Sequence, residues 1–201
     1  MANLQDILYK VSLRSVHGDL DRKIPGLYTD SGKVVAGALF IALKGTHTDG
    51  HLFIGAAIAA GAAAIVCEDL PAALEGTVTY IQVENSAEAA GYIAHNFYGQ
   101  PSEKLRLVGV TGTNGKTTIA TLLYKLFTAL GSKCGLLSTV ENQIGGRIVP
   151  ATHTTPDAIN LNALLKEMLD EGCTYVFMET SSHAIYQHRI AGLRYAGGLF
   201  S

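Results

Sequence analysis

The stretch Val108-Gly109-Val110-Thr111-Gly112-Thr113-Asn114-Gly115-Lys116-Thr117-Thr118 decides the fold class of this chain. It follows an apolar run at residues 105–110 that predicts a buried strand. It precedes residues 119–130, where apolar side chains recur at helical spacing. Strand, glycine-rich turn and helix in this order form the context of a phosphate-binding loop. Glycines let successive N–H groups point at one anion, and the helix N-terminus adds partial positive charge.

Two side chains at the start of this helix have the chemistry of a nucleotide triphosphate site. Lys116 is a cation on a flexible stem that can reach the β- and γ-phosphates, and the Thr117 hydroxyl can ligate Mg²⁺. The strict pattern G-x-x-x-x-G-K-[ST] requires glycine at position 110, where Val110 stands. The alternative interpretation is therefore a glycine-rich turn that only joins a strand to a helix.

The remainder of the second half predicts further alternation of strands and helices. We expect strands at 134–138, 175–178 and 195–201, a hairpin at 142–149 and a helix from Asp157 to near Gly172. Such alternation predicts a mostly parallel sheet whose ligands bind beyond the carboxyl ends of the strands. Glu179 stands at one such end and could ligate Mg²⁺, the alternative being an ordinary strand-end carboxylate.

The first half predicts a second α/β domain. We expect helices at 3–10 and 86–98, a turn at 30–33 and strands at 38–43 and 79–83. Residues 54–67 predict a helix, a turn at Gly61 and a strand. Gly99-Gln100-Pro101-Ser102 reads as a break, and we place the domain boundary there, which gives domains 1–100 and 101–201.

The composition narrows the class of protein. The 201 residues carry a formal net charge of −2 and a pI near 6.4, which gives no argument for a nucleic-acid partner. Three cysteines without framework spacing favour reduced thiols in a cytoplasmic protein. We expect no signal peptide, because residues 1–13 have no charged segment followed by a long apolar one. We expect no membrane insertion, because the most apolar stretch, 54–67, is too short to span a bilayer. We also expect a monomer.

These motifs together resemble the Mur ligase family, over nearly the whole chain. The loop Gly112–Thr118 is similar to the family's ATP loop, which usually has a non-glycine where Val110 stands. The family's branch that adds the third residue of the peptidoglycan stem peptide shares further runs with this chain. These are Asp30-Ser31, Leu39-Phe40-Ile41-Ala42, Gly45-Thr46-His47-Thr48-Asp49-Gly50, His153-Thr154-Thr155-Pro156-Asp157, Met178-Glu179-Thr180-Ser181-Ser182-His183-Ala184 and Gln187-His188-Arg189.

The resemblance implies the fold, the cofactors and the binding residues. It implies an N-terminal α/β uridine-nucleotide-binding domain followed by a truncated P-loop ATP-binding domain with a mostly parallel sheet. Lys116 and Glu179 would serve catalysis, and Thr117 and Glu179 would hold Mg²⁺. ATP would be bound by Thr111, Gly112, Thr113, Asn114, Gly115, Lys116, Thr117 and Thr118. The UDP-muramoyl-dipeptide would be bound by Thr29, Ser31, Thr46, His47, Thr48, His153, Thr154, Thr155, Ser181, Gln187 and Arg189.

The implied reaction joins diaminopimelate or lysine to UDP-N-acetylmuramoyl-L-Ala-D-Glu through an acyl phosphate, with release of ADP. The family's enzymes are more than twice as long, so we expect this chain to be a piece that lacks the rest of its central domain and the amino-acid-binding domain, and to be inactive alone. The family commonly has Asp-Ser-Arg where Asp30-Ser31-Gly32 stands here, and Lys33 could replace the missing arginine. The alternatives are a folylpolyglutamate synthetase-like ligase and a non-catalytic nucleotide-binding module.

Two local patterns in this sequence resemble sites of other chemistry, and the local structure argues against both. His47 and His51 are four residues apart, but glycines at 45 and 50 predict a loop, which makes a metal pair improbable. Ser182 and His183 suggest a serine–histidine pair, yet adjacent residues at a helix start do not face each other.

Overall fold

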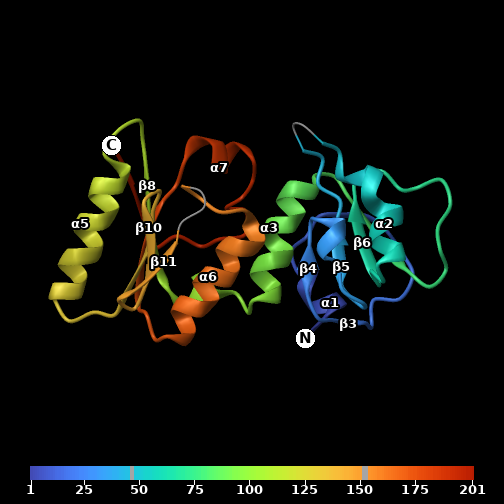
Figure 1. Ribbon diagram of the computed structural model, residues 1–201, viewed down its shortest axis with the longest axis horizontal. Helices are drawn as coiled ribbons and strands as arrows, with labels where there is room; N and C mark the ends of the chain where they lie inside the picture. The colour runs from blue at the N-terminus through green and yellow to red at the C-terminus, as the bar shows by residue number, and fades with distance from the viewer. Residues whose placement is uncertain (46–47, 151–153) are drawn as a thin grey trace. The chain divides into compact units, whose positions relative to one another are not determined.

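The computed structural model describes residues 1–45, 48–150 and 154–201 (Figure 1). The chain forms two compact units, unit 1 (Met1–Phe97) and unit 2 (Tyr98–Ser201). The junction lies at the end of helix α3 (Ser86–Phe97), three residues before the boundary placed from the sequence. Which ligand each unit binds stays a prediction.

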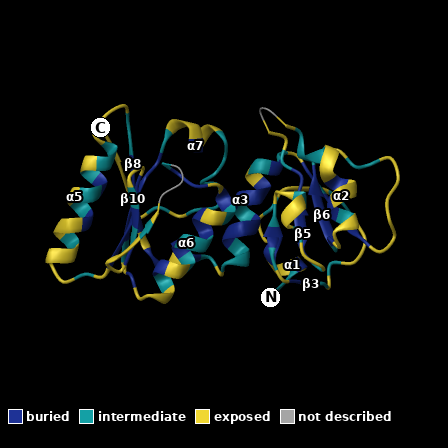
Figure 2. Cartoon of the chain, in the orientation of Figure 1, coloured by how far each residue is buried: buried dark blue, intermediate teal, exposed yellow. Residues whose placement is uncertain are grey.

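Unit 1 is built on a five-stranded sheet in the order β2-β7-β6-β5-β4. Strands β4 (Leu27–Tyr28), β5 (Leu39–Ile41), β6 (Ala64–Cys67) and β7 (Thr79–Val83) run parallel, and β2 (Leu13–His17) is antiparallel at one edge. The four residues of β6 are all buried, as expected of a central parallel strand (Figure 2).

Shorter elements complete unit 1. Helix α2 spans Ile54–Ala59, and α1 spans only Leu4–Ile7, so the helix predicted at 3–10 was too long. Strands β1 (Ala2–Asn3) and β3 (Lys23–Ile24) form a separate two-stranded sheet, and 3-10 turns η1 and η2 span Ser31–Lys33 and Gly50–Phe53. The sequence did not predict strands β1 to β4. Three of these have two residues each, which is too few to show a period.

Unit 2 contains a six-stranded sheet in the order β11-β10-β9-β12-β8-β13. Strands β9 (Cys134–Leu137), β12 (Tyr175–Glu179), β8 (Arg106–Thr111) and β13 (Gly197–Phe200) are parallel. The predicted hairpin is confirmed as the antiparallel pair β10 (Glu141–Ile144) and β11 (Arg147–Pro150). The mostly parallel α/β class is therefore confirmed for both units.

Two helices of unit 2 pack against alternating side chains of the central strand β12. Phe177 packs with Ala120 and Tyr124 of α5 (Lys116–Ala129) in one cluster. Val176 and Met178 pack in another cluster with the apolar side chains of α6 (Ala158–Asp170). Because successive strand residues point to opposite faces, this alternation places α5 and α6 on opposite faces of the sheet.

Helices α4 (Pro101–Lys104) and α7 (Ser182–Tyr186) are short. The break predicted at 99–102 was wrong in part, because Pro101 starts α4, where its fixed φ suits the first helical position. In the described part of the chain, the helices are all too short or too polar to cross a membrane.

Candidate functional site

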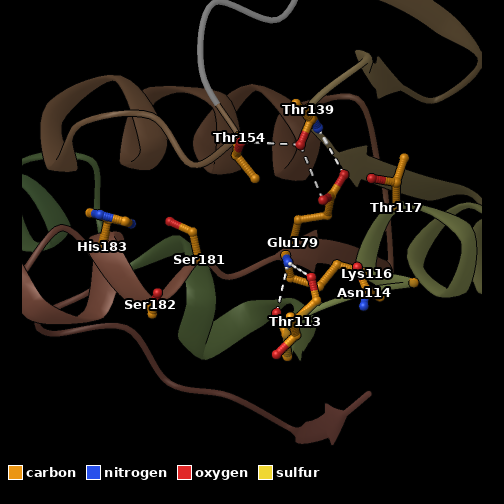
Figure 3. Close-up of a pocket in the computed structure, with 12 residues that line it drawn as sticks. Thr113, Asn114, Lys116, Thr117, Thr139, Thr154, Glu179, Ser181, Ser182 and His183 are labelled. Carbon is orange, nitrogen blue, oxygen red and sulfur yellow. Dashed lines mark hydrogen bonds between the residues drawn. The ribbon is translucent and has the colours of Figure 1, made fainter.

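A pocket of about 370 Å³ lies at the carboxyl edge of the unit 2 sheet (Figure 3). It collects residues from the β8–α5 turn and the start of α5, from the segment after β9, from the end of β12 and the residues after it, and from the segment between β11 and α6. The lining residues are Gly112, Thr113, Asn114, Gly115, Lys116, Thr117, Thr139, Thr154, Glu179, Ser181, Ser182 and His183. The sheet explains this gathering: β12 pairs with both β8 and β9, and Glu179 is the register partner of Val110, so the three strands end side by side.

The β8–α5 turn has the backbone form that the sequence required of its glycines. Gly115 precedes α5 with φ +82°, and Gly112 has φ +131°. A side chain at 112 would also collide with the carbonyl oxygen of Ser201, which would lie 1.9 Å from its Cβ. The turn therefore brings backbone against backbone at a position where only glycine fits.

Lys116 curls back over this turn. Its Nζ donates hydrogen bonds to the carbonyl oxygens of Gly112, at 2.7 Å, and of Thr113, at 3.4 Å. The Thr113 N–H donates to the Ser201 carbonyl at 3.2 Å. The ammonium group therefore lies inside the pocket with the start of α5, and both favour an anion there.

Glu179 is the acidic group of the pocket, and it is only 1% exposed. Both of its oxygens contact one residue. Oε1 accepts the Thr139 N–H at 2.8 Å, and Oε2 lies 3.2 Å from the Thr139 hydroxyl (Figure 3). The Thr139 hydroxyl also lies 3.1 Å from that of Thr154.

The donor set of this pocket fits Mg²⁺. Glu179 and Thr117 both line it and supply oxygen, which is the ligand type that this ion prefers. Among the described residues no group of three or more His, Cys, Asp or Glu could form an all-protein cage. Mg²⁺ commonly binds through one or two protein oxygens plus phosphate and water, so few protein ligands are expected at such a site.

Thr155 and Arg189 support the pocket from outside its lining. The buried Thr155 hydroxyl donates to the Glu179 carbonyl at 2.9 Å and lies 3.3 Å from the Ser181 N–H, which donates to it. Arg189 Nη1 donates to the Thr155 carbonyl at 2.8 Å. Both side chains thus fix the backbone that presents Glu179 and Ser181, and their predicted substrate contacts remain predictions.

Of the other predicted substrate-binding residues of unit 2, some line the pocket and others do not. Thr154 and Ser181 line the pocket with the phosphate loop, whereas Gln187 follows α7 outside the lining. Ser181 is also the N-cap of α7, and its hydroxyl accepts the Ala184 N–H at 3.1 Å, a structural role unlike that of a nucleophile. His153 lies outside the described residues.

The predicted uridine-binding residues of unit 1 follow strand ends. Thr29 comes directly after β4, Ser31 starts the turn η1 that follows, and Thr48 lies in the loop after β5. Lys33 Nζ lies 3.6 Å from Asp30 Oδ2, so the two side chains form an ion pair. The replacement of the family's arginine by Lys33 stays a prediction. Thr46 and His47 lie outside the described residues.

The carboxyl edge of unit 1 is cross-linked by hydrogen bonds. His51 Nδ1 lies 2.6 Å from Asp49 Oδ1, and His51 Nε2 accepts the Glu68 N–H at 2.8 Å. The N–H of His51, followed by its ring, lowers the pKa of the Asp49 carboxyl by hydrogen bonding. Both ring nitrogens are therefore engaged, which argues against His51 as a metal ligand.

Sequence reasoning missed Thr139. A signal was present, because Thr139 directly follows the predicted strand at 134–138 and parallel strands end at the ligand edge. The missing information was the strand order, which puts β9 beside β12 and so brings Thr139 to Glu179.

Comparison with known proteins shows the family to which the chain belongs. The model of the Mur ligase middle domain matches residues 110–201, and that of the Mur ligase family catalytic domain matches residues 23–98. The chain belongs to the Mur ligase family.

Individual relatives lie within one branch of that family. The chain is 60% identical over 200 residues to the UDP-N-acetylmuramoyl-L-alanyl-D-glutamate–2,6-diaminopimelate ligase of Cytophaga hutchinsonii, and 57% identical over 198 residues to that of Bacteroides fragilis. Each match covers 98% of this chain and 41% of the relative, so the chain spans about two fifths of their length.

Solved structures agree with this assignment. A structure of a UDP-N-acetylmuramoyl-L-alanyl-D-glutamate–2,6-diaminopimelate ligase superimposes with a TM-score of 0.79 at 26% identity, over 100% of this chain and 40% of that one. The UDP-N-acetylmuramoylalanyl-D-glutamyl-2,6-diaminopimelate–D-alanyl-D-alanyl ligase from Acinetobacter baumannii shares the fold, with a TM-score of 0.63 at 21% identity over 95% of this chain and 40% of that one.

Proposed function

We propose that this chain forms the uridine-nucleotide-binding and ATP-binding parts of a ligase that adds diaminopimelate, or lysine, to UDP-N-acetylmuramoyl-L-Ala-D-Glu. The observation that carries the proposal is the unit 2 pocket, where the phosphate loop, Lys116 and Glu179 meet at one sheet edge. The names of the relatives support this peptide ligase over a folylpolyglutamate synthetase-like enzyme.

The proposed reaction has two steps. The substrate carboxylate attacks the γ-phosphorus of ATP, which forms an acyl phosphate and releases ADP. The amine of the incoming amino acid then attacks the acyl carbon, phosphate leaves, and the ammonium proton is lost to solvent. Neither step requires a covalent nucleophile from the protein, so its contribution is positioning and charge neutralisation.

Named groups of this chain suit those tasks. Lys116 would turn from its loop carbonyls to the phosphate oxygens, and the N–H groups at the start of α5 would bind the same anion. Thr117 and Glu179 would hold Mg²⁺, which offsets phosphate charge when bound. Thr154 and Ser181, on the same pocket, would contact the muramoyl-dipeptide. Because the chain spans two fifths of its relatives, we expect no ligation by these 201 residues alone.

A calorimetric titration with Mg²⁺ and a non-hydrolysable ATP analogue tests the nucleotide site. We expect binding that Lys116→Ala weakens by about 10- to 100-fold, since a charge-assisted hydrogen bond contributes about 1.5–3 kcal/mol. Lys125→Ala is the matched control, because Lys125 is an exposed lysine of the same helix and does not line the pocket. Equal affinities for the two variants would refute the assignment of Lys116.

A second titration tests the substrate assignment. We expect UDP-N-acetylmuramoyl-L-Ala-D-Glu to bind more tightly than UMP, because only the longer ligand carries the muramoyl-dipeptide that Thr154 and Ser181 would contact. Arg189→Ala should reduce that difference, since Arg189 holds the backbone of Thr155. Affinities for the two ligands that are equal in the unchanged chain would contradict the proposal.

A further inference from the structure

The Thr139 side chain joins two groups to which the proposed function gives separate tasks. Thr139 follows β9 and contacts Glu179, the proposed Mg²⁺ ligand, on one side. On the other side it contacts Thr154, a proposed substrate contact (Figure 3). No residue role assigned above includes Thr139.

The chemistry of these three side chains determines which of them donates each hydrogen bond. An ionised carboxylate only accepts, so the Thr139 hydroxyl donates its single proton to Glu179 Oε2 across 3.2 Å. The same hydroxyl can then only accept from Thr154, whose oxygen is 3.1 Å away. Thr154 in turn has its proton committed to Thr139, which leaves its lone pairs to accept a donor from a ligand.

The Thr139 backbone strengthens the same arrangement. Its N–H donates to Glu179 Oε1 at 2.8 Å, so one residue holds both oxygens of a carboxylate that is only 1% exposed. The carboxylate is therefore fixed in orientation by Thr139. Its remaining lone pairs are left for other ligands of the pocket.

We propose that Thr139 is a positioning residue that couples substrate binding at Thr154 to Mg²⁺–nucleotide binding at Glu179. This inference rests on the proposed function and adds a relay to it: a ligand donor on Thr154 polarises Thr154, then Thr139, then the carboxylate. Each hydrogen bond in this series strengthens the next, and the last one withdraws negative charge from the carboxylate. Mg²⁺ withdraws charge from the same carboxylate, so each ligand weakens the other and the two bind with negative cooperativity. Linkage makes this coupling reciprocal.

The test measures the coupling itself, without turnover. The affinity of the chain for UDP-N-acetylmuramoyl-L-Ala-D-Glu is measured by calorimetry with and without saturating Mn²⁺ and a non-hydrolysable ATP analogue, Mn²⁺ standing for Mg²⁺. The reverse titration follows Mn²⁺ by its paramagnetic resonance signal. We expect each ligand to weaken the binding of the other by about fivefold or more, the lower range of measured allosteric couplings.

Three variants separate a relay from a general structural role. Thr139→Val keeps the shape and the backbone N–H but removes the hydroxyl, and it should bring the coupling factor close to one. Thr139→Ser restores the hydroxyl and should restore the coupling to within about twofold. Thr174→Val makes the same change at the opposite end of β12, where Thr174 lies next to Tyr175, and should leave the coupling unchanged.

Each outcome decides something. Coupling in Thr139→Val equal to that of the unchanged chain would overturn the relay, as would binding of both ligands without coupling in the unchanged chain. Failure of both ligands to bind the unchanged chain would refute the proposed function, and the relay with it. Thr139 is exposed, so its variants should fold, and circular dichroism checks this. If Thr139→Val does not fold, Thr139→Ala replaces it in the same comparison.

Discussion

The carboxyl edges of the two sheets differ in how their polar groups are used. In unit 2 the edge forms a pocket in which a lysine, a carboxylate and a helix N-terminus face the same space. In unit 1 the polar groups at the edge bond one another. Ser86 donates to Glu68 at 2.8 Å and accepts the Lys44 N–H at 3.2 Å, while Glu68 donates its N–H to His51.

The turn after the strand explains part of this difference. In unit 2, β8 passes through a short glycine turn straight into the long helix α5, so free N–H groups point at the edge. In unit 1, β5 leads through residues 42–49 and the turn η2 before the short α2 begins. The carboxyl edge of a parallel sheet is thus where a ligand can bind, and the turn after the strand determines which polar groups face that ligand.

The largest loss of stability should come from substitutions in the hydrophobic cores, and each unit has a core of its own. Phe177→Ala removes a ring that is 1% exposed and packs 5.2 Å from Phe127, and it should cost unit 2 about 3–5 kcal/mol. Ile65→Ala is the counterpart in unit 1, at about 2–5 kcal/mol. Hydrogen exchange read peptide by peptide should rise in the altered unit alone. A rise of equal size in both units would mean that they unfold as one.

The second largest loss of stability should come from a substitution in the hydrogen-bonded edge of unit 1. Ser86→Ala removes a fully buried hydroxyl and leaves the Lys44 N–H and one Glu68 oxygen without that partner. The expected cost is about 1–3 kcal/mol. Peptides that contain β5 and Lys44 should exchange faster, whereas Ser12→Ala, an exposed serine of the same unit, should leave them unchanged. Equal exchange in both variants would show that this network does not stabilise the edge.

A smaller effect should appear at alkaline pH in unit 1. Burial, with a contribution from Asp69, raises the pKa of the Cys67 thiol from 9.0 to about 11. The folded unit therefore holds this proton more tightly than the unfolded chain does. The resulting stability is complete below about pH 9 and is lost as pH rises through 11, by at most about 1.4 kcal/mol per pH unit. Denaturant unfolding at several pH values measures this slope, and Cys67→Ala should reduce it.

The smallest effect should come from the exposed pair of Lys33 and Asp30. Both side chains are more than half exposed, at 76% and 58%, and their charged atoms lie 3.6 Å apart. Lys33→Ala should change the free energy of unfolding by less than about 0.5 kcal/mol. Titration of the same variant with UMP tests whether Lys33 replaces the family's arginine in binding the uridine nucleotide. Affinity equal to that of the unchanged chain would leave Lys33 without that role.

The sequence predicted the helices and strands that have a clear periodic pattern or a clear turn within one stretch of the chain. Strand β8, helices α5 and α6, and the hairpin β10–β11 all have clear periods or turn residues, and the structure confirms them. Strand β2 was missed because its five residues are partly or fully exposed and show no alternation of apolar side chains. Helix α4 was missed because Gly99 before it and Pro101 at its first position favoured a break.

The residues of the candidate site likewise differ in whether local sequence patterns could predict them. The phosphate loop and Glu179 could be placed at one edge from the order of strands and helices alone. Thr139 could not, because its contact with Glu179 spans 40 residues and depends on which strands are neighbours. The support that Thr155 gives to the Glu179 carbonyl likewise depends on a tertiary contact that no local pattern encodes.

The curled position of Lys116 affects how its binding energy should be interpreted. Its ammonium group already donates to two carbonyl oxygens of its own loop, so a phosphate would exchange neutral acceptors for charged ones. The number of hydrogen bonds need not rise, and the gain comes from charge alone. Affinity should therefore fall steadily with ionic strength, and that dependence should weaken when Lys116 is replaced by alanine.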